Sequence, residues 1–213
     1  MHDDTRSHVE AGTMPGRSAL TWSKTMLRDL AAWLARKPVA PYGGHRLVPH
    51  SADSRTIIWV VTATDLVTGV VVDAMIPTAY RPLHLAWVLL VLVMTVGFCA
   101  MTMRTPHLVD GRMLYLRTGP FRALVIPINQ IQTVRAAHGM TPSHGLRRSL
   151  DHDDAVACSV SSATSMALQL TEPLTVQLRK GKPVPVRRVY FTADRPAEAV
   201  ELIRSAMRGD TSL

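Results

Sequence analysis

The chain has 213 residues and a formal net charge of +8, with 24 Lys and Arg against 16 Asp and Glu. Apolar residues make up 47% and charged residues 19%, which excludes general disorder, because disordered chains are poor in apolar residues and rich in charge. Two Cys are too few for a disulfide-dense scaffold or a Cys-built zinc ribbon. The basic charge suits an anionic membrane surface or nucleic acid, but no nucleic-acid-binding motif accompanies it, so we expect no nucleic-acid partner.

The N-terminal arm combines a polar tail with one amphipathic segment. We expect residues 1–20 to be a disordered tail and residues 21–56 to form a helix followed by a loop, which the glycines and prolines of residues 39–56 indicate. The helix is predicted over residues 21–37, where apolar and basic side chains recur with helical spacing. The apolar ones are Trp22, Met26, Leu27, Leu30, Trp33 and Leu34, and the basic ones are Lys24, Arg28, Arg36 and Lys37. Such a helix is typical of an interfacial membrane anchor; the alternative is a helix packed on another protein segment.

Two apolar runs within residues 57–101 predict a transmembrane helical hairpin. The second run, Leu83 to Met101, has 19 residues and no Lys, Arg, Asp or Glu, which is close to the ~20 needed to cross the hydrocarbon core. The first run, Ile57 to Ile76, includes two aspartates. The alternative is a pair of buried helices in a soluble domain, and the second run is too long and too uniformly apolar for that.

The linker between the two runs, residues 77–82, fixes the orientation of the hairpin. It is short and bracketed by prolines, so it can join only antiparallel neighbours. The linker carries a single basic residue, Arg81, and the flanks carry more: Arg46, Arg55, Arg104, Arg112 and Arg117. The positive-inside rule therefore predicts a multi-pass protein of the inner cell membrane with both termini in the cytoplasm.

A polar seam is predicted along the first span. Asp65, Thr68 and Asp73 fall roughly on one helical face, and Asp65 lies level with Thr95 of the second span. Asp73 is shallower. Two side chains near the linker, Arg81 and His84, are within its reach.

Asp65 lies about 12 Å deep along the helix. A charged group there is costly and is by default a candidate functional residue. The functional interpretation is proton or ion handling, or docking of another subunit. The alternative is a hydrogen-bonding seam that holds helices together, which we favour because one hairpin supplies too few helices for a pore.

Residues 107–208 change to short β-type runs that end in a helix. The predicted strands are residues 113–117, 122–126, 131–135, 155–160, 166–170, 174–178 and 186–191. The polar stretch 137–154 is expected to be a loop. Asp194 is the expected N-cap of the closing helix, with Pro196 in its first turn. Six or seven strands before one helix predict a small barrel closed by a C-terminal helix.

The run from Leu114 to Val134 resembles the bacterial PH-like domain of small membrane proteins. The similarity lies in a strand, a turn at Gly119, a strand ending in Ile126-Pro127, and a strand with Ile131 and Val134. A two-span hairpin directly before such a domain is also typical of the family, so the resemblance covers roughly residues 57–208. It implies a membrane hairpin followed by a cytoplasmic, mainly-β PH-like barrel, and it carries no enzymatic residues over.

Two groups of side chains are candidates for binding. Basic residues of the predicted turn at 179–182 can contact phosphate or a lipid headgroup, or form an ordinary solvated turn. These residues are Arg179, Lys180 and Lys182. The stretch 137–154 holds His138, His144, Asp151, His152, Asp153 and Asp154, with Cys158 nearby. Their spacing matches no zinc motif, so we expect no metal and no cofactor.

These observations favour a non-enzymatic integral membrane protein that presents a cytoplasmic PH-like module for binding lipid headgroups or protein. The expected partners are membrane lipid and a protein partner or a second copy of the chain. The first alternative is an accessory or assembly subunit of a membrane transport complex that docks through Asp65. The second is a membrane-bound hydrolase or metalloenzyme that uses the His/Asp stretch.

Overall fold

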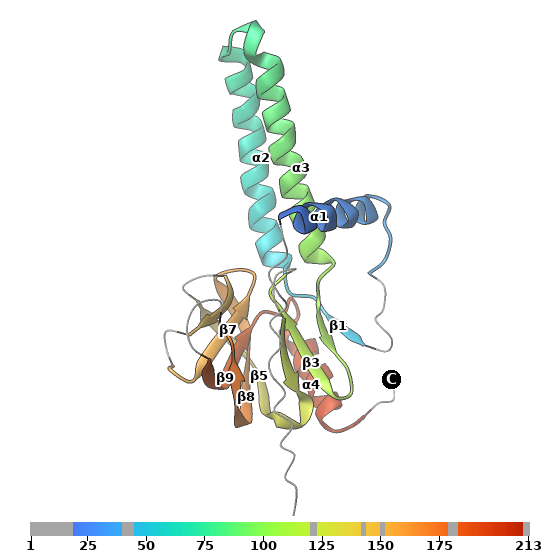
Figure 1. The fold of residues 1–213 in the computed structure, drawn as a ribbon, viewed down its shortest axis with the longest axis vertical. Coiled ribbons are helices and arrows are strands. Elements are labelled where there is room, and N and C mark those ends of the chain that lie inside the picture. The colour runs from blue at the N-terminus through green and yellow to red at the C-terminus, as the bar shows by residue number, and fades with distance from the viewer. Residues whose placement is uncertain are drawn as a thin grey trace, which may run out of the picture.

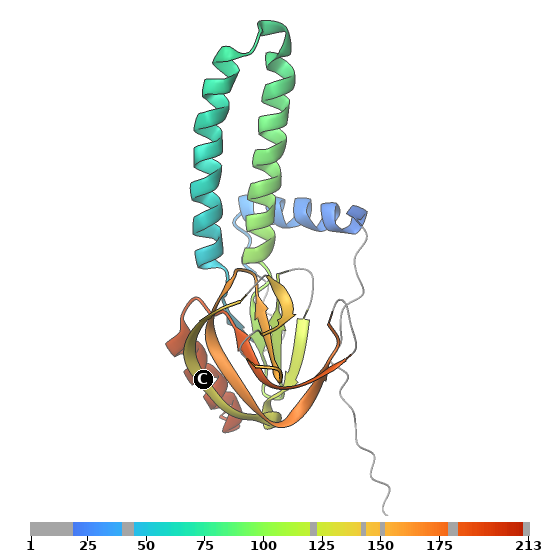
Figure 2. The same ribbon diagram turned by 90° about the vertical axis from the view of Figure 1, so that its left-hand side faces the viewer.

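The computed structural model describes residues 19–39, 45–119, 123–141, 144–149, 152–178 and 183–210. Two long apolar helices stand on a domain of two β-sheets, and a third helix lies across their base (Figures 1 and 2). A fourth helix closes the β domain near the C-terminus. The expected order of helical hairpin, strands and C-terminal helix is therefore present.

The hairpin consists of α2 (Ala52–Met75), a short 3-10 turn η1 (Thr78–Tyr80) and α3 (Arg81–Met103). Both helices are long and apolar enough to cross a membrane, by length and composition. None of the residues of α2 is buried in the protein. Helix α2 begins at Ala52, five residues before the predicted start of the first span at Ile57. The loop predicted over residues 39–56 is therefore wrong in its last part.

Helix α1 (Ala19–Leu34) lies across the base of α3 (Figures 1 and 2). Met26 is buried against Gly97, where an added Cβ would lie 2.8 Å from Met26 Cγ. The buried carboxylate of Asp29 lies 3.8 Å from the Arg104 guanidinium, which also donates a hydrogen bond to the Lys37 carbonyl at 2.7 Å. Glycine at position 97 thus permits the close approach, and an ion pair fixes the crossing.

Sheet A has four antiparallel strands in chain order. They are β1 (Arg46–Val48), β2 (His107–Val109), β3 (Met113–Arg117) and β4 (Ala123–Pro127). Strand β1 precedes the hairpin and β2 follows it, and Leu47 pairs with Leu108. The loop prediction for residues 39–56 is wrong here too, because a three-residue strand leaves almost no periodicity in the sequence.

Sheet B has five strands in the order β5-β8-β9-β7-β6. They are β5 (Ile131–Met140), β8 (Ala163–Val176), β9 (Val184–Phe191), β7 (Ala155–Ser159) and β6 (Gly145–Arg148). The pairs are antiparallel except β7 with β9, which is parallel. Two predicted strands, 166–170 and 174–178, lie largely in the single strand β8, with a register shift between Gln169 and Leu174. The polar stretch 137–154 is not simply a loop, because it contains the end of β5 and all of β6.

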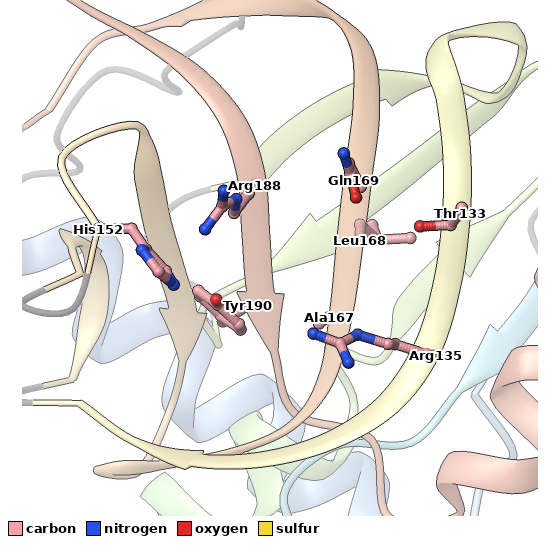
Figure 3. A pocket seen from close by; sticks show the side chains of 8 residues that line it. All are labelled: Thr133, Arg135, His152, Ala167, Leu168, Gln169, Arg188 and Tyr190. Carbon is pink, nitrogen blue, oxygen red and sulfur yellow. The ribbon is translucent and has the colours of Figure 1, made fainter.

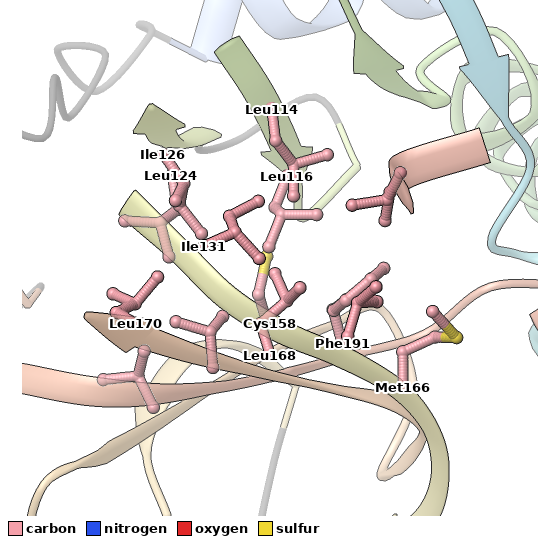
Figure 4. Close-up of a cluster of buried hydrophobic side chains, with 14 of the residues drawn as sticks. Leu114, Leu116, Leu124, Ile126, Ile131, Cys158, Met166, Leu168, Leu170 and Phe191 are labelled. Carbon is pink, nitrogen blue, oxygen red and sulfur yellow. The ribbon is translucent and has the colours of Figure 1, made fainter. Parts of the chain in front are cut away.

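The core lies between the two sheets. Alternating side chains of β3, β4, β8 and β9 point into it, and the largest fully buried ones include Phe191, Leu116 and Met166 (Figure 4). Cys158 is buried there, and burial raises the pKa of its thiol to about 12. Helix α4 (Pro196–Met207) packs on β5 and β2 through Val200 and Ile203.

Asp194 does not cap α4, contrary to the prediction. The residue at the N-cap position is Arg195. The Asp194 carboxylate instead accepts a hydrogen bond from the Ala52 N–H at 2.9 Å, and its own N–H donates to the Pro49 carbonyl at 2.9 Å. The first N–H groups of any helix lack intrahelical partners, so a carboxylate distant in sequence can cap α2 as well as a local one. This contact fastens the base of the hairpin to the β domain.

Candidate functional site

A pocket of about 310 Å³ opens on the face of sheet B that points away from the core (Figure 3). Two cross-strand rows of residues form its floor. Thr133 of β5 pairs with Gln169 of β8, which pairs with Arg188 of β9. In the neighbouring row, Arg135 pairs with Ala167, which pairs with Tyr190. Because side chains two residues apart on a strand share a face, all six positions project outward together.

The small side chain at the centre of the second row makes the hollow. Ala167 lies between Arg135 and Tyr190, and the Arg135 guanidinium extends over it in Figure 3. His152 approaches from beyond β9 and completes the rim. The floor is thus low at its centre and surrounded by longer polar side chains. Such a hollow can hold a small polar ligand.

The charge of the pocket comes from two arginines. Arg188 lies 3.8 Å from the Asp154 carboxylate, and both side chains are about equally exposed. Within the described residues, the Arg135 side chain makes no hydrogen bond or ion pair. No Asp or Glu is among the described residues that line the pocket. One arginine is therefore partly compensated, and the other keeps its full charge available.

Arg187 and Arg188 differ in their position relative to the pocket. Arg188 lines the pocket and Arg187 does not. The backbone N–H groups of both donate to the Asp154 carbonyl, at 2.8 and 3.2 Å. The core-facing neighbours Val186 and Val189 are three residues apart instead of two, so β9 is irregular at this point.

A buried histidine pair lies where the hairpin meets the β domain. The rings of His50 and His107 are stacked, with centroids 4.1 Å apart and planes at 15°. His107 is satisfied in its neutral form: Nε2 donates to the Thr192 carbonyl and Nδ1 accepts from the Arg117 N–H, both at 2.9 Å. Neither ring nitrogen of His50 has a hydrogen-bond partner within the described residues.

Both histidines are held neutral. Burial is the main cause, and it lowers the pKa of His50 to about 4, with the positive charges of Arg55 and Arg117 adding to the effect. Burial also holds the pKa of His107 well below its ordinary value, with the neighbouring His50 as the next contribution. This stacked, desolvated and neutral histidine pair next to the start of α2 is suited to a structural role, in which it holds the hairpin against the β domain.

The polar residues of the hairpin divide into two groups. Asp73 lies half-buried against α3, and its carboxylate is 3.1 Å from His84 Nδ1. The expected reach of Asp73 to His84 is therefore confirmed. Thr95 is half-buried, whereas Asp65 and Thr68 are exposed. The Asp65 side chain makes no hydrogen bond or ion pair with any residue that the structure describes.

Two of the candidate groups from the sequence lie partly or wholly outside the described residues. Arg179, Lys180 and Lys182 fall in the gap between residues 178 and 183, and Asp151 falls in the gap before residue 152. Among the described residues, no three His, Cys, Asp or Glu side chains lie close enough to hold a metal ion. His152 of that stretch is found at the rim of the pocket instead.

Sequence reasoning missed the pocket itself. Its arginines come from strands that are far apart in the chain, and nothing local to Arg135 distinguishes it from a solvated strand residue. The signal was an outward-facing row with a small residue in its middle. That signal can be recognised only once the register of three strands is known.

Comparisons with known proteins identify no relative. No family model, no curated protein and no solved structure matches this chain.

Proposed function

We propose that the chain is a non-enzymatic integral membrane protein whose helical hairpin anchors a cytoplasmic, PH-like β module that binds lipid or a protein partner. The observation that carries the anchor is the exposure of the hairpin. Val67, Val70 and Leu83 are each about two-thirds or more exposed, and the exposed apolar surface continues along both helices. An apolar surface of this extent is unstable in water and is satisfied by the hydrocarbon core of a bilayer.

The position of α1 supports the same interpretation. It crosses α3 at Gly97, and the stretch from Arg81 to Gly97 measures about 24 Å along a helix, comparable with the ~30 Å hydrocarbon core. Leu27 and Leu34 of α1 are 54% and 66% exposed, although Met26 is buried. A helix with exposed leucines at this level suits the bilayer interface.

The pairing of β1 with β2 supports a topology with both ends of the hairpin on one side. These strands flank the hairpin in the chain and are hydrogen-bonded to each other. The side on which they meet also carries Arg46, Arg104 and Arg117, against Arg81 at the linker. By the positive-inside rule this side is the cytoplasm.

Two sheets packed face to face with a C-terminal helix support the PH-like description. Helix α4 lies against β5, β2 and the 3-10 turn η2 (Ile128–Gln130), at the opening between the sheets. The resemblance from Gly119 to Val134 falls on the turn after β3, on β4, and on the start of β5. Because a fold alone does not determine function, the binding role is proposed and does not follow from the PH-like description itself.

The anchor is tested by alkaline carbonate extraction of native membranes together with labelling of single cysteines. We expect the protein to stay in the membrane pellet. A cysteine in place of Tyr80 should react with an impermeant maleimide added from outside. A cysteine in place of Asp210 should react only after the cells are opened. Release by carbonate would contradict the anchor, and the reverse labelling pattern would contradict the orientation.

Asp65 favours a second candidate function, an accessory or assembly subunit of a membrane transport complex. An exposed carboxyl group inside a span, without a partner in the described chain, is costly unless another helix supplies one. Asp65→Leu should then remove a co-purified membrane protein, whereas Thr68→Leu, the matched change at another exposed position of α2, should retain it. Equal co-purification with both variants would reject docking through Asp65.

A further inference from the structure

We propose that the pocket on the outer face of sheet B binds a phosphate group carried by a water-soluble small molecule. The inference rests on the proposed function in one respect, since the anchored hairpin decides which way the pocket faces. It replaces the general role of a binding module with one site and one class of ligand.

Apart from Ala167 and Leu168, the side chains that line the pocket offer hydrogen-bond donors. Arg135 and Arg188 offer guanidinium groups, Thr133 and Tyr190 offer hydroxyls, and Gln169 offers an amide. Guanidinium groups bind phosphate oxygens through paired, charge-assisted hydrogen bonds. Hydroxyl and amide donors can take up the remaining oxygens. The absence of Asp and Glu among the described lining residues disfavours a cationic ligand.

The charge balance leaves one arginine available for a ligand. Arg188 shares its charge with Asp154 across 3.8 Å, a separation longer than a hydrogen bond. Arg135 has no such partner among the described residues, and its guanidinium lies over Ala167 in the direction of Tyr190 (Figure 3). An anion over Ala167 would therefore meet Arg135 directly and would have Arg188 at the opposite corner of the two rows.

Size and direction favour a soluble source of the phosphate over a lipid headgroup. The pocket volume of about 310 Å³ is at the lower end of the range for small-molecule sites. Sheet B forms one flank of the β domain, so its outer face looks sideways and not along the hairpin toward its tip (Figures 1 and 2). A headgroup in the bilayer around the hairpin would thus lie outside the mouth of the pocket.

The test uses the full-length protein in nanodiscs of phosphatidylcholine, with glycerol 3-phosphate as the probe in isothermal titration calorimetry. We expect saturable binding that Arg135→Ala weakens by about tenfold or more, the factor for loss of one good charged contact. Arg187→Ala is the matched control, because it removes the same charge from the same strand at a position that does not line the pocket. This control should bind the probe within about twofold of the unaltered protein.

A second arm distinguishes the two sources of phosphate. Phosphatidic acid is added to the same nanodiscs, and the probe titration is repeated. We expect no competition. Loss of probe binding in the presence of the lipid would assign the site to headgroups and overturn the proposal.

Two further outcomes would also overturn it. Absence of binding at millimolar probe would show that the pocket does not take phosphate. Equal weakening in the Arg135 and Arg187 variants would show attraction by net charge alone. Retention of the protein in carbonate-washed membranes is scored separately, so failure of the pocket is distinguished from failure of the anchor. Protection of the Cys158 thiol confirms that each variant is folded, because Cys158 is completely buried.

Discussion

The apolar residues of the hairpin are largely exposed, whereas those of the β domain are buried. In α2 no residue is buried, whereas β3 and β4 bury Leu114, Leu116, Leu124 and Ile126 almost completely. The hydrophobic effect drives both arrangements, but it can act on the hairpin only if a non-aqueous solvent surrounds it. The comparison shows that the same residue types are packed inside the protein in one region and left exposed on its surface in the other.

Helix α3 contains the boundary between the exposed and the buried parts of the molecule. From Arg81 to Val96 its residues are exposed or half-buried, and at Gly97, Cys99, Ala100, Met101 and Thr102 they are buried under α1 and the β domain. A single helix thus passes from an exposed surface to the protein interior within about one turn.

The largest expected effect sharpens this contrast. Leu116→Ala in the core should destabilise the β domain by about 2–5 kcal/mol, because it removes buried methyl groups and leaves a cavity. Leu89→Ala, at a position 61% exposed on α3, should leave the β domain unchanged. The measurement is the rate of maleimide labelling of Cys158 in denaturant, in a Cys99→Ala background. Equal labelling of the two variants would contradict the separation of the regions.

The next effect concerns acid stability at the junction. In the unfolded chain His50 takes up a proton near its ordinary pKa of 6.5, but in the folded chain only near 4. The unfolded state therefore binds more protons between these values, and stability is lost as the pH falls from about 6.5 to about 4. The full difference corresponds to about 3 kcal/mol.

The protection of the Cys158 thiol from labelling, taken relative to the unfolded chain at the same pH, reports this loss of stability when it is compared at pH 7.5 and at pH 4.5. In His50→Phe the dependence on pH should become shallower, since the remaining contribution is that of His107. An unchanged dependence on pH in this variant would show that His50 is not the group that titrates.

A third prediction addresses the contact of α1 with α3. Gly97→Val would force a side chain into Met26, since even a Cβ would lie 2.8 Å from Met26 Cγ. Overpacking of this kind costs about 1–3 kcal/mol. We expect α1 to detach and trypsin to cleave more readily after Arg28, with Gly69→Val as a control because the neighbour there, Val88, is at 3.4 Å. Unchanged cleavage would mean that α1 is held chiefly by Asp29 and Arg104.

The smallest effect tests the link between the hairpin and the β domain. Asp194→Ala removes the acceptor of the Ala52 N–H and should cost about 1 kcal/mol, as the loss of an N-cap does. Asp194→Asn keeps an acceptor oxygen and should recover most of it. Denaturation followed by Cys158 labelling measures the difference. Equal destabilisation by both variants would point to the charge and not to the hydrogen bond.

The parts of the fold that the sequence predicts are those with a long or regular pattern. The two apolar runs and the alternating strands at Met113–Arg117 and Ile131–Arg135 needed no tertiary information. Strand β1 could not be predicted because three residues show no period. The capping of α2 by Asp194 could not be predicted because its partner is 142 residues away. The pocket was invisible for the same reason, since it exists only in the register of three strands.

The pairing of β1 with β2 also imposes an order on biosynthesis. Residues 46–48 leave the ribosome first, yet their partner strand at 107–109 emerges only after both helices of the hairpin have been made. Strand β1 therefore has no partner strand while the hairpin is being synthesised. Completion of sheet A must therefore wait for the hairpin, and if the hairpin enters a membrane as proposed, its insertion precedes the pairing of β1 with β2.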